Sequence, residues 1–242
     1  MTEARSVASP GADPNRPGGQ TVKPAVMERV RVRTAAELDD RAAILRDPLS
    51  ARAASFRVLR HRLADRGDPK VLVVTSAEDG EGKTTCALNL ACALAESGRN
   101  RVLLLEVNTS RPGLAELLGF LPPGCFLEQL AQHRTEPARP WTVAQIAPHD
   151  VDVLAIQPRA EPRPPLHGPN LLAAIASLRA AYAYTVIDTS SILTGLDVPL
   201  LEDAADGIAI AARAGQTRGR TLTAALEQAG ASRVLGVVLV DG

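Results

Sequence analysis

The sequence contains few aromatic residues and few cysteines. Its 242 residues include three Phe, two Tyr, one Trp and three Cys. The cysteines, Cys86, Cys92 and Cys125, lack metal-ligand spacing and are too few for a disulfide framework, which is the usage expected in a reducing compartment. The core must therefore be built from Ala, Leu, Val and Ile, and such a composition is typical of a buried parallel sheet.

Neither sign of charge dominates, because 27 lysines and arginines balance 27 aspartates and glutamates. Overall charge therefore gives no indication of a nucleic-acid partner, and we expect no nucleic-acid binding. No stretch approaches the roughly 18 consecutive apolar residues of a membrane-spanning helix, and the N-terminus lacks the apolar core of a signal peptide. We therefore expect a cytoplasmic protein.

Composition divides the chain into three parts. Residues 1–25 are rich in proline, glycine and polar side chains and bury too little apolar surface to fold, so we expect them to be disordered. Residues 26–68 are arginine-rich and helix-compatible, and the apolar spacing from Phe56 to Leu63 predicts a helical arm with one basic face. In residues 69–242 short β-branched runs alternate with alanine-rich helices, which predicts one α/β domain.

The alternation in the third part defines the expected fold. Strands are predicted at residues 70–76, 101–107, 151–156, 184–190, 206–213 and 235–241, and helices at 83–98, 113–120, 126–133, 169–182 and 220–230. Strands that alternate with helices require right-handed crossovers and give a mostly parallel sheet with helices on both faces. Ligands of such sheets bind beyond the carboxyl ends of the strands, so the residues that follow each strand are the candidate site.

A phosphate-binding loop is predicted at residues 75–85. The stretch TSAEDGEGKTT lies between the first strong strand and the first strong helix and matches the loop pattern, with alanine in the first glycine position. Glycine lets backbone N–H groups converge on phosphate oxygens, Lys83 would reach the outer phosphates, and Thr84 would ligate magnesium. The alternative is an ordinary turn with glycine and lysine. The predicted nucleotide-binding residues are Asp79, Gly80, Glu81, Gly82, Lys83, Thr84 and Thr85.

A second candidate for metal binding lies at the end of the predicted strand YTVIDTS. This strand carries one carboxylate, Asp188, followed by a threonine and a serine. Opposite the phosphate loop, Asp188 would hold magnesium together with Thr84, directly or through water. An aspartate at a strand-to-helix turn is also a common helix N-cap, and that is the alternative role. The phosphate loop upstream favours the metal role.

The phosphate loop also carries a family pattern, Ser-x-x-Pro-Gly-Glu-Gly-Lys-Ser/Thr. Asp79 replaces the proline, and the matching residues are Ser76, Gly80, Glu81, Gly82, Lys83 and Thr84. On this motif, residues 47–241 resemble the cytoplasmic ATPase domain of bacterial tyrosine kinases, the family partnered with capsule and exopolysaccharide co-polymerases. Related partition and division-site ATPases have a signature lysine early in the loop, where this chain has Glu78, and this difference favours the kinase-like branch.

The resemblance implies a P-loop NTPase fold with ATP and Mg²⁺ as cofactors. It also implies a membrane partner, a polysaccharide co-polymerase or chain-length regulator, that recruits the cytoplasmic chain to the inner membrane. Both implications are expectations from the family and not from composition or spacing.

The family's second acidic motif, Asp-x-Asp-x-Arg-x-Pro, is altered in this chain. Glu106 replaces the first aspartate and Asn108 the second. By the resemblance, Glu106 would orient the attacking hydroxyl, with Lys83 and Asp188 as the other catalytic residues. The added methylene of glutamate moves the carboxylate by more than about an ångström, and an asparagine cannot act as a base. Arg111 is expected either to contact phosphate or to cap the following short helix.

Other family features are incomplete as well. In the helix motif Glu-x-x-Arg-x-x-Arg, which the family uses for ring assembly, Arg57 and Arg60 are present but Ala54 stands in the glutamate position. Residues 50–62 are therefore expected either to mediate homo-oligomer contacts or to form a solvated basic face. Val240 replaces an asparagine that the family places near the nucleotide base. The sequence ends at VVLVDG without a tyrosine-rich tail, so we expect no autophosphorylation on such a tail.

Three functions are consistent with these features. The first is an ATP-binding, tyrosine-kinase-like protein of exopolysaccharide biosynthesis and polysaccharide export that phosphorylates weakly or not at all. The second is an active protein tyrosine kinase or ATPase that uses Glu106 as its base. The third is a partition- or division-type ATPase, against which the missing signature lysine and the lack of a C-terminal amphipathic membrane helix count. A complete phosphate loop beside altered acidic residues favours the first.

Overall fold

The computed structural model describes residues 22–158, 166–230 and 232–240, so of residues 1–25, for which disorder is expected, residues 1–21 lie outside the described residues. The strands are β1 (Met27–Val32), β2 (Val71–Ser76), β3 (Val102–Glu106), β4 (Trp141–Ile146), β5 (Val151–Leu154), β6 (Tyr184–Asp188), β7 (Gly207–Arg213) and β8 (Val234–Val240). The helices are α1 (Ala43–Arg46), α2 (Ala51–Asp65), α3 (Lys83–Ala95), α4 (Leu114–Leu118), α5 (Phe126–His133), α6 (Gly168–Ala181), α7 (Asp197–Leu201) and α8 (Gly219–Ala229).

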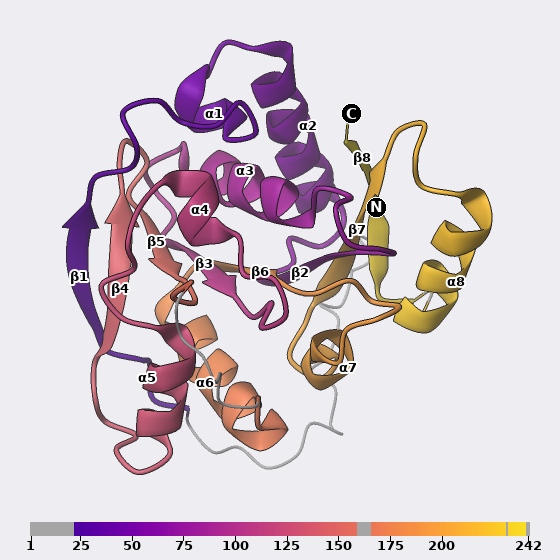
Figure 1. The fold of residues 1–242 in the computed structure, drawn as a ribbon. Helices are drawn as coiled ribbons and strands as arrows, with labels where there is room; N and C mark the ends of the chain where they lie inside the picture. The colour runs from indigo at the N-terminus through magenta and orange to yellow at the C-terminus, as the bar shows by residue number, and fades with distance from the viewer. Residues whose placement is uncertain (1–21, 159–165, 231, 241–242) are drawn as a thin grey trace, which may run out of the picture.

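The strands form one eight-stranded sheet in the order β1-β4-β5-β3-β6-β2-β7-β8, and helices cover both of its faces (Figure 1). Helices α1 to α4 pack on one face, and α5 to α8 pack on the other. The sequence of β2 is a continuous apolar run because both faces of this strand are buried. Leu72 and Val74 belong to the core on the first face, and Val71 and Val73 to the core on the second. The predicted mostly parallel sheet with two helical layers is confirmed.

Two strands were not predicted from the sequence. β1 pairs in parallel with β4, and β4 pairs antiparallel with β5. β1 lies at the edge of the sheet, and its exposed charged side chains are typical of edge strands. The helix-compatible interpretation of residues 26–68 is therefore wrong for β1, because pairing with β4 decides its conformation and the local residue preferences do not.

The remainder of the basic arm is docked on the helix that follows the phosphate loop. Phe56 and Leu63 of α2 belong to the same buried cluster as the aliphatic side chains of α3. Buried Asn89 on α3 accepts a hydrogen bond from Ile44 N (3.0 Å) and donates one to Arg41 O (2.7 Å). Hydrophobic packing and a buried side-chain amide therefore hold the arm against the domain.

The two arginines of the α2 motif bind within the chain. Arg57 Nε lies 2.8 Å from a carboxylate oxygen of Glu96, and Arg60 Nη1 donates to Ala93 O at 2.6 Å. The hydrogen bond from Arg57 is the main cause that lowers the pKa of Glu96. Both arginines thus bind the last turn of α3 and its C-cap, where cations are favoured by the helix dipole. Contacts of residues 50–62 with a second copy remain a prediction.

Replacement of Asn89 by alanine should loosen the arm. The main-chain groups of Ile44 and Arg41 would lose their partner in a buried place, so we expect the free energy of unfolding to fall by about 1–3 kcal/mol. Guanidinium denaturation measures this change. Asn100→Ala is the matched control, because Asn100 makes a single long hydrogen bond of 3.5 Å. Equal stability losses in the two variants would contradict the assigned role of Asn89.

Candidate functional site

The segment between β2 and α3 has the conformation of a phosphate-binding loop. Gly80 and Gly82 have φ values of 84° and 90°, in the left-handed region that favours glycine. Gly82 is the N-cap of α3 and has no side-chain oxygen to accept hydrogen bonds from the first amides of that helix. These amides and the partial positive charge of the helix N-terminus form an anion-binding position.

Glu81 stabilises the loop from behind. It is only 6% exposed, and its two carboxylate oxygens accept hydrogen bonds from Glu78 N (2.8 Å) and from the Thr217 hydroxyl (2.5 Å). The second contact ties the loop to the residues that follow β7. The Glu81 carboxylate thus fixes the shape of the loop, and the binding of nucleotide by Glu81 stays a prediction.

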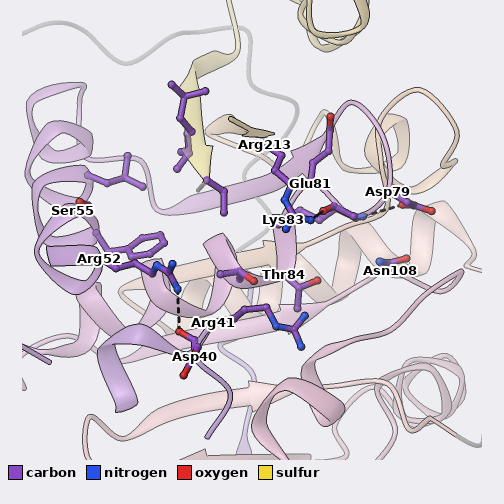
Figure 2. Close-up of a pocket in the computed structure, with 18 of the residues that line it drawn as sticks. Asp40, Arg41, Arg52, Ser55, Asp79, Glu81, Lys83, Thr84, Asn108 and Arg213 are labelled. Atoms are coloured by element: carbon purple, nitrogen blue, oxygen red, sulfur yellow. Dashed lines mark hydrogen bonds and ion pairs between the residues drawn. The ribbon is translucent and has the colours of Figure 1, made fainter. Parts of the chain in front are cut away.

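A cavity of about 630 Å³ opens over the loop, between α2 and β8 (Figure 2). The seven residues predicted to bind nucleotide all line it. Its far wall is largely apolar and comprises Phe56, Leu59, Val238, Leu239 and Val240, whereas the cations around it are Arg41, Arg52, Arg111 and Arg213. An apolar wall opposite a glycine-rich loop with a lysine and a helix N-terminus is an arrangement that suits a nucleotide, which carries a flat base at one end and phosphates at the other.

Thr84 lines this cavity and contacts the buried Asp188 behind it. The Thr84 hydroxyl donates to Asp188 Oδ2 at 2.8 Å. Asp188 is fully buried, and among the described residues its Oδ1 has no hydrogen-bond partner. Burial, followed by the nearby charge of Glu106, raises the pKa of Asp188 to about 8. The alternative of a helix N-cap is excluded, because the next helix begins at residue 197 with Leu196 as its N-cap.

These two side chains fit a magnesium ion. Mg²⁺ prefers hard oxygen ligands and takes one or two carboxylates from the protein, with water and phosphate completing the shell. A hydroxyl and a buried carboxylate with one unused oxygen match that donor set. In the described part of the chain no group of three or more His, Cys, Asp or Glu is placed to hold a metal, so such an ion would depend on the nucleotide for further ligands.

Glu106 is bound by main-chain amides on both carboxylate oxygens. Oε1 accepts from Gly113 N (2.6 Å) and Leu114 N (2.9 Å), and Oε2 accepts from Ile156 N (2.8 Å). The side chain is fully buried, and its length lets it join the first turn of α4 to the segment that follows β5. The geometry therefore favours a structural role for Glu106 over the predicted orientation of an attacking hydroxyl.

Asn108 and Arg111 shape the loop after β3. Asn108 Oδ1 accepts from Arg111 N at 3.1 Å, which closes a turn. Arg111 was expected either to contact phosphate or to cap the following short helix. The start of that helix, α4, is already capped by Glu106, which accepts hydrogen bonds from its first amides. The Arg111 guanidinium instead lies at the cavity, with Nη1 3.9 Å from Asp79 Oδ2. This position favours the phosphate role for Arg111.

Sequence reasoning missed a contact inside the phosphate loop. Asp79 Oδ1 lies 2.9 Å from Lys83 Nζ, and Figure 2 shows the two side chains directed toward each other. The hydrogen bond from Lys83 is the main cause that lowers the pKa of Asp79. The i, i+4 spacing of an acid and a base was a visible signal, but Asp79 was predicted only as a nucleotide-binding residue in the place of the family's proline, and no contact with Lys83 was predicted.

Comparison with known proteins gives relatives but no family model, since no protein-family model matches the chain. The chain is 29% identical over 204 residues to the succinoglycan biosynthesis transport protein ExoP of Rhizobium meliloti, a match that covers 79% of this chain and 25% of ExoP. It is 26% identical over 192 residues to the tyrosine-protein kinase CpsD of Streptococcus agalactiae, with 76% of this chain and 81% of CpsD covered. The predicted resemblance to bacterial tyrosine kinases is confirmed. The chain spans only a quarter of the length of ExoP.

Solved structures of bacterial tyrosine kinase domains share the fold of this chain. The kinase domain of Escherichia coli tyrosine kinase ETK superposes with a TM-score of 0.70 at 18% identity, and the match covers 90% of each chain. The predicted α/β fold, a mostly parallel sheet with helices on both faces, is thereby confirmed. Within the described ranges, none of the helices has the length and apolar character needed to cross a membrane.

Replacement of Glu106 by glutamine should cost stability. The glutamine amide nitrogen is a donor, so at least one of the three main-chain N–H groups would lose its acceptor, and we expect a loss of about 1–3 kcal/mol in the free energy of unfolding. Guanidinium denaturation measures it. The control is Glu116→Gln, which removes the same charge from an exposed position on α4. Unchanged stability of the Glu106 variant would argue against the structural role.

Proposed function

We propose that the chain is an ATP-binding, tyrosine-kinase-like protein of capsule or exopolysaccharide biosynthesis and export, with weak or absent phosphotransfer. The observation that carries the nucleotide part is the contact of Thr84, which lines the cavity of about 630 Å³ at a glycine-rich loop, with the buried Asp188. One oxygen of Asp188 has no hydrogen-bond partner among the described residues. The relatives named above support the pathway.

Different residues of the cavity would bind different parts of the nucleotide. The amides at the start of α3 and the Lys83 ammonium would hold the phosphates, and the apolar wall on α2 and β8 would accept the base. Thr84 and Asp188 would hold magnesium, which neutralises charge on the phosphate oxygens when bound. Asp188 is fully buried, and its Oδ1 has no hydrogen-bond partner in the described part of the chain, so this oxygen is available to such an ion.

The altered second acidic motif, with Glu106 and Asn108 in place of two aspartates, supports weak or absent phosphotransfer. Proton removal from an attacking hydroxyl requires a carboxylate within hydrogen-bond reach of that hydroxyl. Glu106 is fully buried and its two oxygens face main-chain amides, whereas Asn108 is an amide. An active kinase that uses Glu106 would have to break these hydrogen bonds. Glu78, in the place of the signature lysine, continues to disfavour a partition- or division-type ATPase.

The proposed setting is the cytoplasmic side of a polysaccharide export system. We place the nucleotide-binding domain at residues 69–242 and its docked arm at residues 26–68. The proposed partner is a membrane co-polymerase or chain-length regulator that brings the chain to the inner membrane, and the relationship to ExoP, a transport protein of polysaccharide biosynthesis, supports it.

Removal of the loop lysine should abolish nucleotide binding. In Lys83→Ala the outer phosphates lose their buried cation, so we expect ATP affinity in the presence of magnesium to fall by at least about 100-fold. Isothermal titration calorimetry measures it. Lys70→Ala is the control, because Lys70 precedes β2 at the end remote from the loop. If the unmodified protein shows no magnesium-dependent binding of ATP, the proposal is abandoned.

Phosphotransfer is the second test. With radiolabelled ATP and the products of neighbouring genes as acceptors, we expect little or no label on protein, because Glu106 is held by main-chain amides and Asn108 cannot act as a base. Strong labelling that disappears in a folded Glu106→Gln variant would instead support the active kinase. The denaturation measurement above shows whether that variant is folded.

A further inference from the structure

We propose that Asp79 takes the place of the terminal phosphoryl group of the nucleotide and thereby weakens triphosphate binding more than diphosphate binding. This inference rests on the proposed nucleotide function and concerns the selectivity of the same site. Asp79 lies in the phosphate loop, lines the cavity and has a side chain that is 38% exposed.

Two cationic side chains from different segments lie beside this carboxylate. Lys83 Nζ is 2.9 Å from Oδ1, and Arg111 Nη1 is 3.9 Å from Oδ2. Lys83 is the first residue of α3, after β2, and Arg111 lies in the loop after β3, so both belong to the carboxyl edge of the sheet, where ligands of α/β folds bind. An ammonium and a guanidinium beside one anion are also groups that recognise a phosphoryl group.

The carboxylate and a phosphate compete for the same lysine. The Lys83 side chain is only 7% exposed, and Asp79 already accepts from its ammonium. A phosphate oxygen that contacts Lys83 must either displace the carboxylate or lie against it. Displacement costs the free energy of the ion pair, and close approach brings two anions together, so both outcomes reduce affinity.

The penalty should be greatest at the outermost phosphate. The lysine of a phosphate loop reaches the outer phosphates, while the loop amides hold the inner ones. Oδ2 of Asp79 points toward Arg111, which belongs to the loop after β3 and not to the phosphate loop itself. The carboxylate therefore lies on the side where the third phosphoryl group extends beyond the loop. A diphosphate lacks this third group, so the Asp79 carboxylate repels it less strongly.

Calorimetry on Asp79→Asn tests the proposal, because asparagine keeps the size of the side chain and removes its charge. In magnesium buffer of low ionic strength we expect ATP affinity to rise about tenfold and ADP affinity to rise by clearly less. The matched control is Glu78→Gln, which removes the same charge from the neighbouring exposed residue and should change either affinity by less than about twofold. Asp79→Ser, which also lacks the charge, should repeat the asparagine result.

Equal gains for ATP and ADP, no gain, or a loss with both Asp79 variants folded by thermal melting would overturn the proposal. The gain must also shrink as salt is raised, because it originates in charge. Failure of the proposed function gives a different result. If neither the unmodified protein nor any variant binds ATP, nucleotide binding itself is rejected, whereas ATP binding that ignores Asp79 rejects only the selectivity.

Discussion

Two buried carboxylates lie next to each other at the carboxyl edge of the sheet, and the rest of the site is arranged around them. Glu106 ends β3 and Asp188 ends β6, and the two residues are directly paired in the register of these neighbouring strands. Both are fully buried. Two like charges so close in a region of low dielectric constant are strongly destabilising unless each is compensated. The chain compensates the two in different ways.

Glu106 is compensated by three main-chain amides, and Asp188 by a hydroxyl and by partial neutralisation. The first solution fixes the charge within the protein and stabilises the start of α4. The environment of Asp188 allows its carboxyl group to lose its proton when a cation binds, since a nearby cation favours the ionised form. The same edge thus provides one structural carboxylate and one carboxylate suited to a metal. In the proposed function, nucleotide binding uses only the second, and the amide contacts of Glu106 are the reason that weak phosphotransfer is proposed.

Local sequence patterns predicted most of the fold, and they failed where distant segments decide the outcome. The predicted helix at residues 126–133 agrees with α5, and the strand that precedes the phosphate loop starts within one residue of the prediction. β4 was missed because it pairs antiparallel with β5 and so breaks the alternation of strand and helix on which the prediction relied. The role of Glu106 was hidden for a similar reason. One of its partners, Ile156, is 50 residues away, and no spacing in the sequence indicates that contact.

The docked arm belongs to the binding site and is not an accessory. Phe56 and Leu59 of α2 form part of the apolar cavity wall, and Asn89, which holds the arm, also donates to Thr85 O in the first turn of α3. Arg57 and Arg60, the residues that the family resemblance connects with assembly, bind Glu96 and Ala93 O at the C-terminal end of α3. Any contact between copies that used these arginines would have to replace a charge-assisted hydrogen bond already made within the chain. Such a contact would also change the packing of α2, the helix that forms part of the cavity wall. Assembly through α2 and nucleotide binding would therefore be coupled through the same element.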